Sequence, residues 1–359
     1  MNFIIDADFG DSIVGWLTPD NPSATPKLIV IVPGRPPVEV TANVMRDGIR
    51  DLGLHSTGLV GFKITNDIIP DLINLDEILI IESETRLPIY GRFQKERHIK
   101  KKLFLFDCSI VPPRNILDSI KPHFSLFYTN SERYSLETAI SMITNPFNES
   151  IFITGRTKLA HYDHYLVEKG YTRAALLRDP FEELAERLIL LNYISKMPSH
   201  ESAQQYIHGI TGLIDFARTL SFNNLKSLRS SFRSLDDKIS QMLMSPMTKV
   251  FACETGDPPT RADVSKSLDN LARLEVVGTR ERYELFKEIL AGALNDDLIG
   301  EQMPLSSQAV VTLAEKLSCI SAVSDILGDD LALYSYVDEA VSEGLEKAKE
   351  QLSYRNEKL

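Results

Sequence analysis

One arginine stands where a predicted helix begins, and it is the side chain with the clearest potential for binding chemistry. An apolar run at 174–177 stops at Arg178-Asp179-Pro180, and a helical pattern follows. Pro180 suits the first helical turn, where its missing N–H leaves no bond unmade, and Asp179 is placed to cap the helix. In an α/β protein such a turn faces the ligand crevice. Arg178 is therefore a candidate anion anchor, because a guanidinium binds phosphate through two N–H groups. An ion pair with Asp179 or a nearby glutamate is the structural alternative.

Two histidines offer a second kind of chemistry. His161 and His164 are three residues apart and would share a helix face. A neutral imidazole near pH 7 suits removal of a proton from a hydroxyl group, so either histidine is a candidate general base. The alternatives are ordinary surface histidines or a metal pair, and no third metal ligand is indicated. The upstream turn at 154–157 (TGRT) resembles a phosphate-binding turn but is too short to specify one.

Composition restricts the class of protein. The chain has 359 residues and a formal net charge of −11, which predicts two or more domains and disfavours general affinity for nucleic acid or anionic lipid. No apolar run is long enough to span a bilayer, and the N-terminus lacks a basic leader pattern. Cys108, Cys253 and Cys319 have neither metal-ligand nor disulfide-framework spacing. We therefore expect a cytoplasmic protein with no membrane span and no metal.

The first part of the chain predicts an all-β module. Residues 1–92 contain short extended runs separated by turn residues, which is typical of a small β-sandwich. Trp16 is predicted to anchor its core, with a sugar-stacking platform as the alternative. Residues 93–102 then form a basic linker, whose cluster KERHIKKK is either a solvated face or a rim that attracts phosphate. The predicted extended runs are Ile13–Trp16, Leu28–Val32, Val38–Ala42, Val60–Ile64, Ile78–Glu82 and Leu87–Tyr90.

From residue 103 to about 350 the pattern predicts an α/β domain with a helical C-terminal half. Apolar runs alternate with helical stretches, which is typical of a parallel sheet with covering helices. The handedness of crossover connections makes Leu103–Phe106, Ile151–Thr154 and Ala174–Leu177 neighbouring strands, with Asp107 and Arg178 at their carboxyl edge. Beyond residue 200 we expect helices, apart from an extended run at 274–278. Ser306 or Ser307 would cap one helix, and the last helix would end near Lys349.

Four short motifs resemble those of carbohydrate sulfotransferases, in the same order along residues 103–345. The resemblance implies a P-loop-like sulfotransferase fold, 3′-phosphoadenosine 5′-phosphosulfate as the donor, and a carbohydrate or polysaccharide acceptor. The N-terminal module is similar to modules attached to bacterial polysaccharide-modifying transferases, which allows a protein partner there. The motifs are Leu177-Arg178-Asp179-Pro180 with Glu182, Phe152–Gly155, Val276–Tyr283, and Asp330–Tyr334.

The resemblance also assigns roles to individual residues. Arg178 would bind the 3′-phosphate of the donor. The loop at 107–114 would hold the sulfate-bearing phosphate, but it lacks glycine, so Ser109 and Arg114 are its remaining side-chain donors. The glycine–histidine pair that carries the family's general base matches Gly155-Arg156, which makes Arg156 a candidate catalytic residue beside the two histidines.

Further along, glutamates replace two of the family's phosphate ligands. Glu183 and Glu186 stand where the family has arginine and serine, and Arg187 and Arg173 would compensate in part. Two functions remain open for the chain. One is sulfate transfer from the phosphoadenosine donor to a carbohydrate in polysaccharide biosynthesis. The other is a non-catalytic protein of the same fold that binds a glycan or a protein partner.

Overall fold

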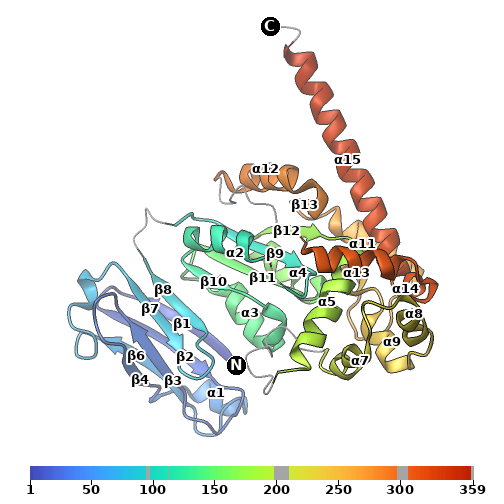
Figure 1. The fold of residues 1–359 in the computed structure, drawn as a ribbon. Coiled ribbons are helices and arrows are strands. Elements are labelled where there is room, and N and C mark those ends of the chain that lie inside the picture. The colour runs from blue at the N-terminus through green and yellow to red at the C-terminus, as the bar shows by residue number, and fades with distance from the viewer. Residues whose placement is uncertain (94–97, 112, 198–209, 297–305, 357–359) are drawn as a thin grey trace.

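The computed structural model describes residues 1–93, 98–111, 113–197, 210–296 and 306–356 (Figure 1). Its N-terminal part contains two antiparallel sheets of four strands, with the orders β1-β2-β6-β5 and β4-β3-β7-β8. Alternate residues of both sheets fill a shared apolar core, so the predicted antiparallel β architecture is confirmed. The strands are β1 (Asn2–Asp8), β2 (Ser12–Thr18), β3 (Lys27–Ile31), β4 (Val38–Thr41), β5 (Val44–Met45), β6 (Leu59–Thr65), β7 (Ile78–Glu82) and β8 (Pro88–Arg92), with a short helix α1 (Asp47–Asp51).

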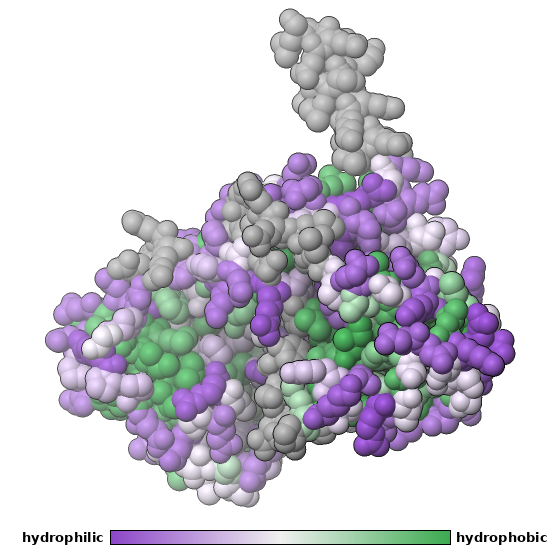
Figure 2. Space-filling model, viewed as in Figure 1, coloured by the Kyte–Doolittle hydropathy of each residue, from purple (hydrophilic) through white to green (hydrophobic). Residues whose placement is uncertain are grey.

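The predicted role of Trp16 is wrong. Ile13 and Leu17 on β2 point into the core, and the two-residue period of a strand places Trp16 on the opposite face. There Trp16 is only half-buried and is paired with the exposed Ile4 of β1. Figure 2 shows hydrophobic side chains gathered over the N-terminal module in this view. Docking of a protein partner on this module stays a prediction.

The second part is built on a parallel sheet of five strands in the order β10-β11-β9-β12-β13. The predicted neighbours are confirmed, because β9 lies between β11 and β12 and pairs with both in parallel register. Asp107 ends β9 and Arg178 follows β12, so both lie at the carboxyl edge as expected. The strands are β9 (Lys102–Asp107), β10 (Leu126–Tyr128), β11 (Ile151–Gly155), β12 (Thr172–Leu177) and β13 (Val276–Thr279).

Helices cover both faces of this sheet, which explains the continuous apolar run along β9. Leu103 and Leu105 pack in one buried cluster with α2 (Arg114–Ile120) and α12 (Tyr283–Leu294). Phe104 and Phe106 point to the other face and belong to the cluster that includes α3, α4, α10 and α11. The bounds of these helices are α3 (Leu136–Thr144), α4 (Leu159–Glu168), α10 (Pro246–Ala252) and α11 (Arg261–Leu271).

A further apolar core holds the helical C-terminal half together, around α5 and α13. Ser307 caps α13 by accepting a hydrogen bond from the N–H of Val310, whereas Ser306 lies among polar groups near Arg178. The last helix, α15, extends beyond Lys349 and projects from the body in Figure 1. No helix among the described residues is both long and apolar enough to cross a membrane. The helices are α5 (Pro180–Ile194), α7 (Leu213–Thr219), α8 (Leu225–Arg233), α9 (Asp237–Leu243), α13 (Gln308–Ser318), α14 (Ser321–Ile326) and α15 (Gly328–Asn356).

Buried hydrogen bonds join the two parts. Asn145 and Asn148 donate from their side-chain amides to the carbonyl oxygens of Ile89 and Gly91 in β8, at 3.0 and 2.8 Å. Tyr128 donates to the carbonyl oxygen of Pro88 at 2.8 Å. Part of the basic linker, residues 94–97, lies outside the described residues. Separate folding of residues 1–92 stays a prediction, and these contacts oppose it.

Candidate functional site

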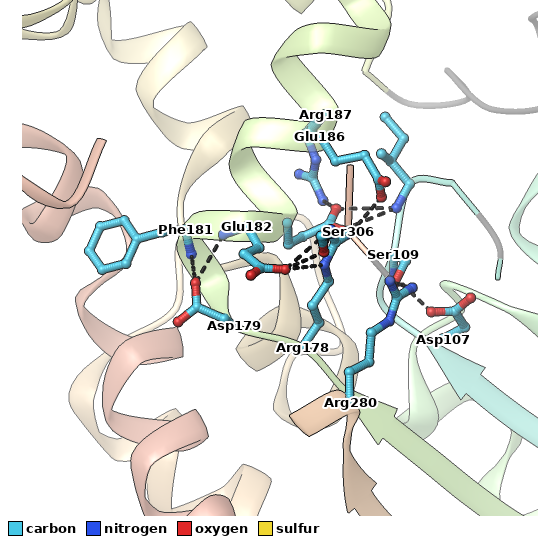
Figure 3. A network of polar contacts seen from close by, with 12 residues as sticks. Asp107, Ser109, Arg178, Asp179, Phe181, Glu182, Glu186, Arg187, Arg280 and Ser306 are labelled. Carbon is cyan, nitrogen blue, oxygen red and sulfur yellow. Dashed lines mark hydrogen bonds and ion pairs between the residues drawn. The ribbon is translucent and has the colours of Figure 1, made fainter. Parts of the chain in front are cut away.

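An arginine follows each of three parallel strands at the carboxyl edge of the sheet. Arg156 follows β11, Arg178 follows β12 and Arg280 follows β13. Their side chains have different surroundings. Arg178 and Arg280 lie in a buried polar cluster (Figure 3), and Arg156 lines an adjoining cavity. Ligands of α/β proteins bind at this edge, so both regions are candidate sites.

Arg178 is held by glutamates of the helix that it precedes. Its side chain is 2% exposed, and its Nη1 forms an ion pair with Glu186. Its Nη2 donates to Ser306 Oγ at 2.8 Å and lies 3.5 Å from Glu182 Oε2. Asp179 caps α5 as predicted, accepting from the backbone N–H groups of Phe181 and Glu182, both at 2.9 Å. The guanidinium therefore lies among carboxylates of its own chain, which is the structural alternative that the sequence left open.

The loop after β9, where a bound anion was expected, instead contacts Glu183 of α5. The side chain of Glu183 is 3% exposed and accepts a hydrogen bond from Arg187 Nη2 at 2.7 Å. It also accepts from the backbone N–H of Ile110 at 3.2 Å. Nearby, Arg280 donates to Ser109 Oγ at 2.6 Å, while the N–H of Ser109 donates to Asp107 at 3.0 Å. A loop expected to bind the donor phosphate thus binds a glutamate of the protein.

The charges of the cluster oppose a further anion. Burial raises the pKa of Asp107 to about 6, and burial also raises the pKa of Glu186. Burial, together with the nearby Arg178, lowers the pKa of Arg280. The cluster combines three arginines with four carboxylates, so a phosphate placed there would meet excess negative charge. The residues present do not fit the phosphate groups of the phosphoadenosine donor. The members are Arg178, Arg187, Arg280, Asp107, Glu182, Glu183 and Glu186.

A cavity of about 410 Å³, here called the basic pocket, lies at the same edge of the sheet. Among the described residues, five cationic side chains and one acidic side chain line it. Three of the cations come from the sheet side, after β11 and on α5, and two come from α9 and α10. The charged lining residues are Glu132, Arg156, Lys158, Arg187, Lys238 and Lys249.

Arg187 belongs to both the cluster and the pocket. Its side chain is only 4% exposed, and one terminal nitrogen is paired with Glu183. Its Nε is buried and has no hydrogen-bond partner among the described residues. An unsatisfied donor on a buried guanidinium is costly, because it has neither water nor a hydrogen-bond acceptor. Arg187 is therefore the deepest cation that the pocket offers to a ligand.

The other pocket cations are held in defined positions. Arg156 Nε donates to Glu132 at 2.9 Å, and the N–H of Arg156 donates to the same carboxylate at 3.0 Å. Lys158 Nζ donates to the carbonyl oxygens of Glu254 and Thr255. Lys249 Nζ donates to a carbonyl oxygen of α9, and burial lowers the pKa of this lysine. The acidic residue is thus neutralised by Arg156, which leaves the pocket with a positive charge excess.

The structure separates the residues that the sequence grouped into one site. Arg156 and Arg187 meet in the basic pocket, whereas Arg178 and Ser109 are enclosed in the neighbouring cluster. Arg114 is the exposed first residue of α2.

Neither histidine lines the pocket. His161 Nε2 hydrogen-bonds the carbonyl oxygen of Glu254 at 2.9 Å. The side chain of His164 is 84% exposed and lies 3.8 Å from Glu168. These positions do not support a general-base role for either residue. Among the described residues, no group of three or more His, Cys, Asp or Glu side chains is placed to hold a metal ion.

Several pocket residues were missed from the sequence. Lys238 and Lys249 reach the pocket only because α9 and α10 fold back over the sheet edge, and nothing in their local sequence indicates that packing. Arg280 did carry a signal, since it follows an extended run directly, as Arg156 and Arg178 do.

Comparison of the chain with models of known protein families and with curated protein sequences found no match. Functional inference for this chain therefore starts from the geometry of the pocket.

Proposed function

We propose that this protein is a binding protein with a sulfotransferase-like α/β domain, and that it binds an organic anion in the basic pocket without catalysing transfer. The observation that carries this proposal is the charge of the pocket, whose described lining has five cationic side chains, one of them (Arg187) paired with Glu183, against one carboxylate, in a chain whose net charge is −11. A unit charge about 4 Å from a partly buried cation gains roughly 4 kcal/mol before desolvation costs. Such local concentration of positive charge selects anionic ligands.

Two features support binding over transfer. The loop after β9 donates to Glu183 of the protein, and Arg178 is paired with Glu186, so the expected donor groups already have partners. His161 and His164, the predicted general bases, lie outside the pocket lining. Transfer to a hydroxyl group needs both a held donor and a base on the acceptor.

Sulfate transfer to a carbohydrate is the second candidate function. The ends of β9 and β12 lie at one sheet edge, as the resemblance to carbohydrate sulfotransferases implies. In this version Glu183 and Glu186 would have to release their arginines before a phosphoadenosine donor could bind. A carbohydrate or polysaccharide ligand, and a protein partner on the N-terminal module, are likewise proposals that depend on the resemblance.

Calorimetric titration tests the binding function. Glucose 6-phosphate and phenyl phosphate carry the same phosphate ester group, on a sugar and on an aromatic ring respectively, so at least one should bind. Replacement Lys249→Gln removes a pocket cation and should weaken binding about ten- to a hundredfold, because a charged hydrogen bond contributes roughly 1.5–3 kcal/mol. The control is Lys226→Gln, an exposed lysine on α8 outside the pocket.

Absence of binding by both phosphates would overturn the binding function. So would binding that Lys249→Gln leaves unchanged. The second candidate predicts a different pattern, in which adenosine 3′,5′-bisphosphate binds and Arg178→Ala abolishes the interaction while Lys249→Gln does not.

A further inference from the structure

The basic pocket also has an apolar wall, formed mainly by residues of α9 and α10. Pro246 and Val250 are four residues apart on α10 and line the pocket from the same helix face. Met242 of α9 and Ile210 extend this apolar surface. Val250 is buried, whereas Met242 and Pro246 are half-buried. The pocket therefore combines an anion-binding side with a surface that favours nonpolar groups.

The cations lie beside this wall. Lys249 is adjacent in sequence to Val250, and Lys238 lies four residues before Met242 on α9. Arg187 lines the pocket from α5. A ligand that reaches Arg187 and Lys249 with its charged group would consequently place the rest of its body against α9 and α10.

We propose that the ligand is a phosphate or sulfate monoester whose organic body is apolar, such as an aryl or branched alkyl group. This inference rests on the proposed binding function and specifies its ligand class. Arg187 and Lys249 hold the ester oxygens, and Met242, Pro246 and Val250 cover the organic body. The cavity of about 410 Å³ is far larger than a free inorganic anion and lies within the range of small-molecule sites.

The wall disfavours sugars and free anions. Each sugar hydroxyl turned toward Val250 or Pro246 would lose its water without gaining a hydrogen bond. A free phosphate would satisfy the cations but leave the apolar wall in contact with water, so it would gain nothing from that surface. Glu132 is the one acidic residue in the described part of the lining, and its ion pair with Arg156 at 2.9 Å limits its repulsion of the ligand.

Calorimetric titration with three probes at one ionic strength tests this inference. Phenyl phosphate should bind about tenfold more tightly than glucose 6-phosphate and tighter still than inorganic phosphate, because covering about 60 Å² of apolar surface corresponds to that factor. Val250→Thr keeps the side-chain volume but adds a hydroxyl group to the wall, and should reduce the preference to about threefold. The matched control is Val167→Thr, an exposed valine on α4 (58% exposed), which should leave the preference unchanged.

Met242→Gln provides a second variant at a half-buried position, which keeps the test available if Val250→Thr does not fold. It should lower the affinity for phenyl phosphate and leave that for glucose 6-phosphate within twofold. Equal affinities for the two esters, both dependent on Lys249, would overturn the ligand class while the binding function stands. Absence of binding by all three probes would overturn the binding function and this inference together.

Discussion

Replacing Asp107 with asparagine isolates one buried carboxyl group and should change how stability depends on pH. Burial raises the pKa of Asp107 from its ordinary value of 3.8 to about 6, and burial does the same for Asp330. The folded state therefore binds these protons more tightly than the unfolded state. The stabilisation is fully present below pH 4 and is lost as pH rises through about 6, with a total of about 3 kcal/mol per group.

The effect is best measured between pH 5 and 7. Over this range the rise in pH should lower the free energy of unfolding by about 1 kcal/mol for each group. Carboxyl groups whose pKa is lowered, such as Asp8 and Glu275, act in the opposite sense but mainly below pH 4.5. Asp107→Asn keeps an oxygen to accept from the N–H of Ser109 and should remove the contribution of this group, about 1 kcal/mol of the pH-dependent loss.

Urea unfolding followed by circular dichroism at pH 5, 6 and 7 provides the assay. Asp118→Asn, an exposed substitution on α2, is the control and should retain the wild-type pH response. A wild-type free energy of unfolding that is flat or rises over this range would refute the reasoning, as would an Asp107→Asn variant with the same slope as the wild type.

Three further substitutions test the contacts that shape the site and join the two parts. Arg178→Ala leaves the half-buried Glu186 without its ion pair and removes a cation 3.9 Å from the buried Glu183, so it should cost about 3–5 kcal/mol in urea unfolding; a loss below 1 kcal/mol would mean that the pair is not enclosed. Gly155→Ala brings a Cβ within 2.3 Å of Ser131 Oγ and should cost about 1–3 kcal/mol, with no change in stability as the contrary result. Asn145→Ala leaves a buried carbonyl oxygen of β8 unpaired, so limited proteolysis between the two parts should accelerate by about tenfold; an unchanged cleavage rate would show that this bond does not hold the module in place.

The strand framework was predictable because its signals are local. The run from Leu103 to Phe106 is apolar at every position, as expected for a strand covered on both faces, and the structure places it in the middle of the sheet. The helix after Arg178 was equally clear, since Asp179 and Pro180 form a start signal that depends only on neighbouring residues. The prediction for Trp16 was wrong because it relied on the size of the side chain. The two-residue period of the strand places Trp16 on the face away from the core.

The site was only partly predictable, because its electrostatics depend on tertiary packing. The sequence identified Arg156 and Arg187, but not that these two meet in a pocket while Arg178 is enclosed with glutamates. Lys249 became a pocket residue through the packing of α10 against α4, α11 and α15, which no local pattern records. The sequence indicated that glutamates stand where the carbohydrate sulfotransferases that it resembles have phosphate ligands. It did not indicate that the N–H of Ile110 and the side chain of Arg187 both donate to Glu183.

The central claim is that the anion site of this protein is the basic pocket rather than the Arg178 turn, and a crystal structure with 4-bromophenyl phosphate tests it most directly. The anomalous signal of bromine locates the organic body independently of the phosphate. We predict phosphate oxygens within hydrogen-bond distance of Arg187 and Lys249, with the bromine beside Met242 and Val250. A phosphate bound to Arg178 in place of Glu186, or a ligand bound outside the pocket, would contradict the claim.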